Sequence, residues 1–191
     1  MKQFILYASK AVTSPDFSLN DLPGSGGRMD LVARCIGNAL WLSHDLRRDT
    51  CIHVVACGSP PVVISFYGNR LRSVSPDERN IAAWIKKTLA STRRNPGIIL
   101  RKLSFQQLVA ALVSEGNSFY ILEEEGTDIA RVNLKEDSVF VLGDHIGLPI
   151  EEEKFVEQFE HEKISLGATS YLASQCITVV HYELDRLKVS V

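Results

Sequence analysis

The chain has 191 residues, of which 45% are hydrophobic and 23% charged, and its formal net charge is −2. This composition and length fit one globular domain over residues 1–191 with a sizeable core. No apolar run approaches the roughly 20 residues that cross a bilayer, and the apolar stretch after Met1 is too short for a signal peptide.

The charge is divided unevenly along the chain. Residues 1–102 carry 15 Lys/Arg and 7 Asp/Glu, whereas residues 103–191 carry 6 and 16. A basic half can bind a polyanion such as RNA. The two halves could equally complement each other within the fold or across a dimer, and charge alone leaves both interpretations open. The four cysteines form no CxxC pair, which favours free thiols in a reducing cytoplasm over disulfides or zinc.

Strand patterns alternate with helix patterns along the chain. In order, they predict a strand over 3–8, a helix over 28–45, a hairpin of strands over 51–57 and 61–68, a helix over 75–92, and a strand over 97–102. A helix over 104–115, a strand over 119–125, a helical turn over 127–132, a strand over 138–144, a helix over 148–159, a strand over 163–167 and a helix over 170–187 follow. Ser75 and Ser104 are the expected N-caps. This alternation predicts an α/β fold with a mainly parallel sheet and helices on both faces.

Three predicted strands end beside glycine or open directly into loops. In α/β sheets, ligands bind at the carboxyl ends of strands, and these ends fall at Leu122, Gly143 and Leu166-Gly167. Neither GxGxxG at a strand–helix turn nor GxxxxGK[ST] occurs, so a classical dinucleotide fold and a P-loop are not supported. The many acidic residues around these loops disfavour a phosphate-rich cofactor and favour one that carries positive charge.

The segment GDHIGLP, residues 143–149, is compatible with a metal site, an anion-binding loop or backbone wrapped around a neutral ligand. A metal needs three or four convergent donors, and the sequence near Asp144 and His145 supplies no further donors in a recognisable spacing. We therefore expect no metal and expect Asp144 to cap the turn. His181 is expected to be a partly buried structural residue, and Ser-His-Asp hydrolysis lacks a nucleophile elbow.

Two C-terminal stretches, VLGDHIGLP and ISLGATSYLASQCITVVHYELD, resemble the SPOUT class of S-adenosylmethionine-dependent RNA methyltransferases. Within that class the chain is similar to the archaeal tRNA pseudouridine-54 N1-methyltransferase family (TrmY). The N-terminal stretches FILYASKA and GGRMDLVARCIGNALWLSHD look like the same family, so the resemblance covers essentially the whole chain.

The resemblance implies a C-terminal trefoil knot, an exception to the rule that folds are not knotted. It also implies a homodimer and a backbone-lined pocket for S-adenosylmethionine. The cofactor contacts that it implies are Leu122, Gly143, Leu166, Gly167, Ser170, Leu172 and Cys176. For Leu172 and Cys176, plain helix core is an alternative that stays open.

On the substrate side, the resemblance implies a tRNA that contains pseudouridine. Arg28 and Asp30 are the implied catalytic residues, and Arg34 shares a helix face with Asp30 because it lies four residues later. Arginines would contact base carbonyls or phosphate, while Asp30 would contact a ring N–H and is a candidate proton acceptor. The alternative is a surface Asp–Arg pair of little energetic value. The further RNA-binding candidates are Asn69, Arg70, Arg72, Arg93 and Arg94.

Other functions remain open at this point. A ribosomal-RNA pseudouridine N1-methyltransferase (Nep1-like) would share the fold and the reaction. A non-catalytic RNA-binding module would explain the basic half but would leave the glycine-containing loops without a role. A cofactor-independent hydrolase that depends on Ser170 or His181 is a more distant alternative.

Overall fold

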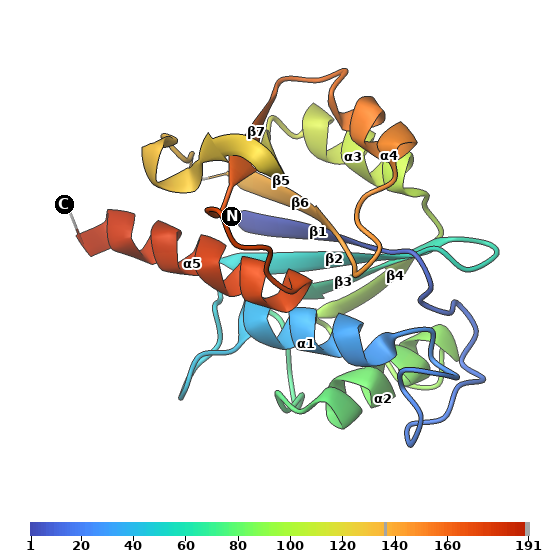
Figure 1. The fold of residues 1–191 in the computed structure, drawn as a ribbon. Coiled ribbons are helices and arrows are strands. Elements are labelled where there is room, and N and C mark those ends of the chain that lie inside the picture. The colour runs from blue at the N-terminus through green and yellow to red at the C-terminus, as the bar shows by residue number, and fades with distance from the viewer. Residues whose placement is uncertain (136, 190–191) are drawn as a thin grey trace.

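The computed structural model describes residues 1–135 and 137–189, which build a seven-stranded sheet and its covering helices (Figure 1). The strands are β1 (Lys2–Ala8), β2 (Thr50–Ala56), β3 (Val62–Tyr67), β4 (Ile98–Arg101), β5 (Ser118–Asp128), β6 (Ser138–Gly143) and β7 (His161–Ser165). The helical elements are α1 (Met29–Leu40), α2 (Glu78–Leu89), α3 (Phe105–Ser114), the 3₁₀ turn η1 (Ile129–Arg131), α4 (Ile150–Val156) and α5 (Ala173–Val189).

The sheet has the strand order β4-β3-β2-β1-β6-β5-β7. Within the described chain, β3 alone runs against the others, because it pairs antiparallel with both β2 and β4. The predictions of a mainly parallel sheet and of the β2–β3 hairpin are therefore confirmed. The carboxyl ends of β1, β2, β5, β6 and β7 meet at one edge of the sheet, which we call the carboxyl edge; the opposite edge is the amino edge.

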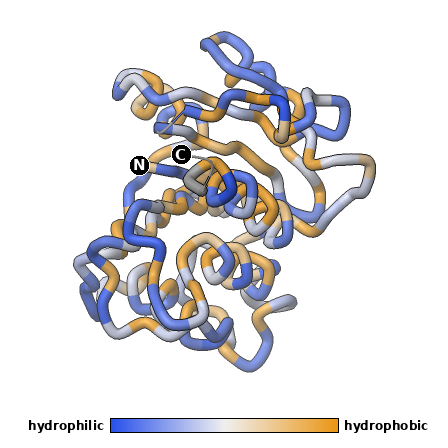
Figure 2. Tube along the Cα trace, turned by 90° about the vertical axis from the view of Figure 1, so that its left-hand side faces the viewer, coloured by the Kyte–Doolittle hydropathy of each residue, from blue (hydrophilic) through white to orange (hydrophobic). Residues whose placement is uncertain are grey.

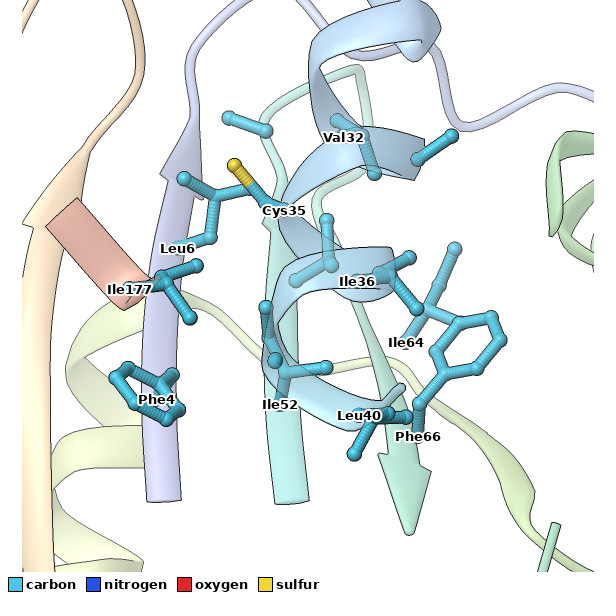
Figure 3. Close-up of a cluster of buried hydrophobic side chains, with 14 of the residues drawn as sticks. Phe4, Leu6, Val32, Cys35, Ile36, Leu40, Ile52, Ile64, Phe66 and Ile177 are labelled. Atoms are coloured by element: carbon cyan, nitrogen blue, oxygen red, sulfur yellow. The ribbon is translucent and has the colours of Figure 1, made fainter. Parts of the chain in front are cut away.

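Helices cover both faces of the sheet, as the sequence predicts. Side chains of α1, α2 and α5 join one buried cluster, and those of α3 and α4 join the cluster on the other face (Figure 1). In the first cluster, Phe4 and Leu6 of β1 lie near Cys35 and Ile36 of α1, with Ile177 of α5 beside them (Figure 3). Hydrophilic segments gather in the outer loops (Figure 2), and the apolar core fixes the helices on which the site is built.

The predicted element boundaries shift in places for local reasons. Ser104 caps α3 as expected and forms a capping box with Gln107. The cap of α2 is Asp77 rather than Ser75, because the helix begins at Glu78 and the Asp77 carboxylate accepts the Asn80 N–H at 2.7 Å. Strand β5 continues beyond its predicted end because its pairing with β7 shifts register and then resumes.

Helix α5 returns across the sheet from its far edge. Strand β7 is the edge strand beside β5, yet α5 packs against α1, which covers β1 and β2. The connection from Leu166 to Leu172 therefore crosses the ends of β5 and β6, where the predicted cofactor loops lie. The trefoil knot implied by the resemblance stays a prediction.

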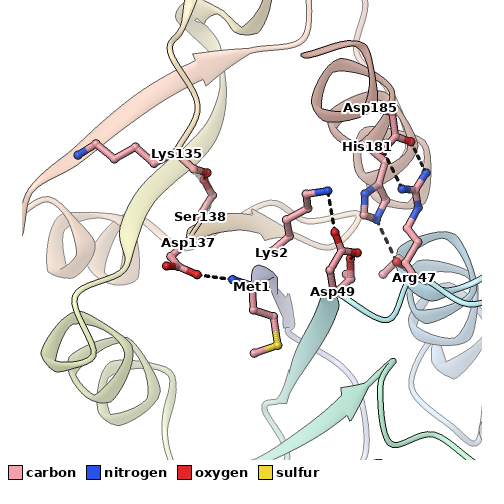
Figure 4. Close-up of polar contacts among 11 residues, drawn as sticks. Met1, Lys2, Arg47, Asp49, Lys135, Asp137, Ser138, His181 and Asp185 are labelled. Atoms are coloured by element: carbon pink, nitrogen blue, oxygen red, sulfur yellow. Dashed lines mark hydrogen bonds and ion pairs between the residues drawn. The ribbon is translucent and has the colours of Figure 1, made fainter. Parts of the chain in front are cut away.

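Polar contacts tie α5 and the strands together near the amino edge (Figure 4). Arg47 donates two hydrogen bonds to the Asp185 carboxylate, at 3.1 and 2.6 Å. The His181 Nε2 lies 2.9 Å from the Ala39 carbonyl oxygen, and its ring packs edge-on against Phe4 at 5.0 Å. His181 is buried, as expected, and burial together with the Arg47 charge lowers its pKa from 6.5 to about 4.

The lowered pKa of His181 predicts a loss of stability in acid. As the pH falls from 6.5 towards about 4, the unfolded chain binds a proton at His181 that the folded chain does not. The free energy of unfolding should therefore fall, by up to ~1.4 kcal/mol per pH unit from this one group. His181→Gln keeps a donor for the Ala39 carbonyl and removes the titration, so its decline should be shallower. Urea unfolding of both proteins across this range measures the difference, and parallel curves would contradict the assignment.

Candidate active site

A cavity of about 290 Å³ opens at the carboxyl edge, where β5, β6 and β7 end and the chain turns into α5. Six of the seven predicted cofactor residues line it: Leu122, Gly143, Leu166, Gly167, Ser170 and Cys176. The seventh, Leu172, is absent from the lining, and its side chain is 64% exposed just before α5. Loops that are 20 or more residues apart in sequence thus build a single cavity wall.

Bare backbone forms much of this wall. A Cβ atom on Gly143 would lie 2.1 Å from the Gly147 carbonyl carbon and 2.3 Å from the Leu148 nitrogen, so no side chain fits there. Gly167 has φ +109°, a conformation that glycine adopts readily, and the space where its Cβ would stand is open. Backbone groups at both positions can therefore approach a ligand closely.

Asp144 was expected to cap the turn, and it does more. Its carboxylate accepts the Ile146 N–H at 2.9 Å and also the Ser9 N–H at 2.8 Å and the Ser9 hydroxyl at 2.7 Å. Its side chain is 3% exposed and forms part of the cavity wall. The acid thereby fastens the end of β1 to the loop after β6, a connection between Ser9 and Asp144 that neither local sequence predicts.

The sequence places many acidic residues around these loops, and two of them form one side of the cavity. Glu123 and Glu124 lie in the register shift between β5 and β7, and both line the cavity. The Ser170 hydroxyl donates to the Glu124 carboxylate at 2.8 Å, across the space between two loops. Burial, followed by the nearby Glu153 charge, raises the pKa of Glu123. Two acids at this wall suit a ligand with positive charge.

The predicted catalytic residues lie together at the start of α1. Arg28 adopts φ 66° and directs its guanidinium to the Asp30 carboxylate, with Nε and Nη2 at 3.0 and 3.1 Å from the two oxygens. Arg34 donates to the same carboxylate at 2.7 Å from the next turn. Asp30 is buried, whereas Arg34 keeps 41% of its side chain exposed. A carboxylate held by two arginines is more constrained than an isolated surface pair.

The pKa of Asp30 bears on its chemical role. Burial favours the protonated acid, but hydrogen bonds from Arg28 and the Leu31 N–H, with the charges of both arginines, outweigh it and lower the pKa. Asp30 is therefore ionised at neutral pH. It is a good hydrogen-bond acceptor and a weaker base than an ordinary aspartate.

The arginine–aspartate group adjoins the cavity. The pKa of Arg28 is raised by its hydrogen bond to Asp30 and also by the charge of Asp144, which lines the cavity. Further along α1, the Asn38 side chain donates to the Ser174 carbonyl at 2.8 Å, which ties this helix to the start of α5 beside the cavity.

The backbone contacts agree: the Val12 N–H donates to the Gly26 carbonyl at 3.4 Å, and Ser9 of the same loop bonds to Asp144 of the cavity wall. The start of α1 and the cavity are therefore joined through the loop that follows β1.

The other predicted RNA-binding residues lie elsewhere. Asn69, Arg70 and Arg72 follow β3, whose carboxyl end lies at the amino edge because β3 is antiparallel. Arg93 and Arg94 follow α2 and come close to them through Asn95, which bonds to the Arg72 backbone. The structure thus separates these five residues from Arg28, Asp30 and Arg34.

Two structural features are absent from the described chain. Over residues 1–135 and 137–189, no three His, Cys, Asp or Glu side chains are grouped to hold a metal ion. In the same part of the chain, no helix has the length and apolarity to span a membrane. The absence of a metal stays a prediction.

Comparisons with known proteins agree with this geometry. A family described as SAM-dependent RNA methyltransferases matches residues 1–189. A tRNA (pseudouridine(54)-N(1))-methyltransferase of Methanocaldococcus jannaschii is 42% identical, with 99% of this chain and 98% of that protein aligned. A protein of the same name from Methanococcus maripaludis is 46% identical over 98% of this chain and 100% of its own. Archaeoglobus fulgidus Nep1, solved with S-adenosylhomocysteine, has the same fold (TM-score 0.74, 14% identity, 98% and 99% covered).

The cavity fits S-adenosylmethionine in size and in chemistry. Its volume of about 290 Å³ lies close to the lower end of the range for small-molecule sites, roughly 300–1,000 Å³. The backbone at Gly143 and Gly167 can surround an adenine ring. Glu123 and Glu124 supply negative charge for a ligand that bears a sulfonium and an ammonium group.

We expect Gly143→Ala to weaken S-adenosylmethionine binding by at least about tenfold, because the new methyl group must displace the 147–148 backbone that forms the cavity wall. Gly37→Ala in α1 is the matched control, since its Cβ would meet nothing closer than 3.7 Å. The control should bind normally and gain up to ~1 kcal/mol of stability. Isothermal titration measures the affinity, and thermal unfolding checks that both variants are folded. Equal affinity in the two folded variants would contradict this view of the cavity.

Proposed function

This chain belongs to the family of SAM-dependent RNA methyltransferases, and from that premise we propose that it methylates N1 of pseudouridine 54 in the T-loop of tRNA. The observation that carries the proposal is the identity of 42% and 46%, over nearly the whole chain, with two proteins named for that reaction. The arginine–aspartate group beside a cofactor-sized cavity supports it. Nep1 shares the fold at 14% identity, which supports the fold alone.

On this proposal, cofactor and base meet between the cavity and α1. Bound S-adenosylmethionine supplies an activated methyl group on its sulfonium. Residues Leu122, Gly143, Leu166, Gly167, Ser170 and Cys176 surround the cofactor, while Leu172, exposed at the entrance to α5, would contact it only at its rim. Asp144 holds the loop that faces α1, so that methyl group and base can be aligned for an in-line transfer.

The two arginines have an electrostatic role in the proposed reaction. N1 of the base must lose its proton in order to take the methyl group. While the proton has left and the methyl group has not yet been transferred, negative charge spreads over the pyrimidine carbonyls; methyl transfer removes it and leaves the cofactor neutral at sulfur. Arg28 and Arg34 are placed to stabilise this charge. Because its pKa is lowered, Asp30 is better suited to accept a ring N–H and to hold both arginines than to remove the N1 proton.

The experiment that tests the function is methyl transfer from labelled S-adenosylmethionine to tRNA that carries pseudouridine at position 54. A tRNA with uridine there is the control, because uridine N1 is bonded to ribose and has no proton to lose. A ribosomal-RNA hairpin that contains pseudouridine tests the Nep1-like alternative. We expect N1-methylpseudouridine, identified by mass spectrometry, in the first RNA alone.

Asp30→Asn should lower kcat on this tRNA by roughly a hundredfold, because the carboxylate that positions both guanidinium groups is lost and they are no longer held in place to stabilise the anionic base. Its affinity for S-adenosylmethionine should change by less than about threefold, since Asp30 is outside the cavity lining.

In the experiment with the three RNAs, methylation of the hairpin alone would move the protein to the ribosomal alternative. No transfer to any RNA, despite cofactor binding, would support a non-catalytic RNA-binding module and refute the proposed reaction.

We further propose that two copies of the chain form a homodimer in the cytoplasm. Large apolar side chains, among them Leu42, Tyr182 and Leu187, remain exposed in the single chain, and the last two are on α5. Exposed apolar groups on one element are typical of association surfaces. The four unpaired cysteines suit a reducing compartment.

The dimer can be tested at Tyr182, which is 61% exposed and whose ring centre lies 5.8 Å from the Arg186 guanidinium of its own helix. Tyr182→Glu places a charge on the apolar surface and should raise the dimer dissociation constant at least tenfold. Sedimentation velocity over a range of concentrations measures it. Lys154→Glu, at an exposed position of α4, is the control. A Tyr182→Glu variant that remains fully dimeric would show that α5 is not the interface.

A further inference from the structure

A second basic surface lies at the amino edge. Two short segments, 69–72 and 93–94, are held together by Asn95, whose side chain is buried. Its Nδ2 donates to the Arg72 carbonyl at 2.7 Å, and its Oδ1 accepts the Gly97 N–H at 3.1 Å. We call the exposed residues that these contacts bring together the amino-edge patch: Asn69, Arg70, Arg72, Arg93 and Arg94.

The positive charge of the amino-edge patch is not neutralised locally. Its four arginines form no ion pair with any residue that the structure describes. Residues 69–102 contain nine Lys/Arg and two acids. Of these acids, Glu78 lies 3.7 Å from Arg34 and Asp77 caps α2, so both are engaged elsewhere.

One part of the patch is held in place in advance. The Arg93 guanidinium lies 4.8 Å from the centre of the Trp84 ring, and the Lys87 ammonium lies 5.1 Å from the same centre. The Trp84 indole N–H donates to the Ser73 carbonyl at 3.2 Å. The tryptophan therefore links α2 to the segment that carries Arg72 and fixes two cations near the surface.

The amino-edge patch is too far from the site to contact the reacting base. Tyr67 pairs with Cys51, and the Gly68 N–H bonds to the Thr50 carbonyl, so the patch begins at the start of β2. The cavity begins at Gly143, beside the end of β1. Strands β1 and β2 run in register over this length, which corresponds to roughly 20 Å at ~3.3 Å per residue.

We propose that the amino-edge patch binds the phosphate backbone of a helical stem of the substrate RNA, about 20 Å from the reacting base. Unpaired arginine forks match phosphate oxygens, and RNA stems are recognised mostly through shape, phosphate and ribose rather than through base edges. The inference rests on the proposed RNA methyltransferase function. It deepens that function, because it makes the stem next to the target loop part of what the enzyme recognises.

The test compares two RNAs and two matched double variants. One RNA is full-length tRNA, and the other is a T-loop hairpin whose stem is too short to reach the patch. Arg70→Gln with Arg94→Gln removes two patch cations whose side chains make no hydrogen bond or ion pair among those the structure gives. Arg131→Gln with Lys154→Gln removes two exposed cations elsewhere and changes the net charge equally.

Binding is measured by fluorescence anisotropy at several salt concentrations, so the readout does not depend on methyl transfer. For full-length tRNA, the patch variant should bind roughly tenfold more weakly, and its slope of log K against log salt should be shallower by about one to two. Its hairpin affinity should change less than twofold. The control variant should bind both RNAs as the wild type does.

Three outcomes would overturn the inference. The patch variant could bind full-length tRNA with wild-type affinity and salt slope, or it could lose hairpin binding by the same factor. Alternatively, sedimentation could show that it dissociates a dimer, which would assign the patch to the acidic half of a second copy. Wild-type protein that binds tRNA but methylates neither RNA would refute the proposed reaction, while the patch would still be judged by the binding data.

Discussion

The buried carboxylate of Asp144 joins the two halves of the site. It accepts two hydrogen bonds from Ser9 at the end of β1 and one from Ile146 within its own loop. These residues are 135 positions apart, yet the contact sets the position of the cavity loop relative to the segment that leads to α1. A buried carboxylate without such partners would cost several kcal/mol. The three donors therefore make this arrangement of the two loops strongly preferred.

The electrostatics of the site follow from that arrangement. Arg28 is hydrogen-bonded to Asp30, and the charge of Asp144 on the cavity wall also raises the pKa of Arg28. Arg28 therefore stays a cation at the start of α1. Arg34, which is more exposed, supplies a second positive charge towards solvent. The acids of the cavity wall and the arginines of α1 give the site opposite charges on its two sides, which suits a cationic cofactor and a base that becomes anionic.

Much of this structure could be predicted from sequence, because short sequence patterns specify individual helices and strands. The apolar periodicity of α1, the Ser104 capping box and the continuous apolar run of β6 each specify one element. The cavity lining was accessible as well, because parallel strands bring Leu122, Gly143 and Leu166 to one edge. The resemblance to a known family added Ser170 and Cys176, which no spacing rule would identify.

The rest depends on contacts between distant segments. The Ser9–Asp144 contact cannot be recognised from either segment alone. The acids at 123 and 124 enter the cavity only because β5 changes register against β7. The hairpin was predicted, but its consequence for the placement of Arg70 and Arg72 was not. Because β3 is antiparallel to β2, the residues that follow β3 lie at the edge of the sheet opposite the site.

The lowered pKa of Asp30 favours a particular division of labour for the proposed reaction. A carboxylate that two arginines stabilise is a weak base, because protonation would break these favourable interactions. The site is therefore better suited to stabilise an anionic base than to remove its proton by strong general-base catalysis. On the proposed reaction, positive charge next to the base lowers the free energy of the N1 anion, so the N1 proton can be lost without a strong base. Uridine has no N1 proton, so the chemistry itself rejects it. What the protein must still recognise is the position of the base within the RNA. We assign that recognition to cations outside the cavity, namely the amino-edge patch.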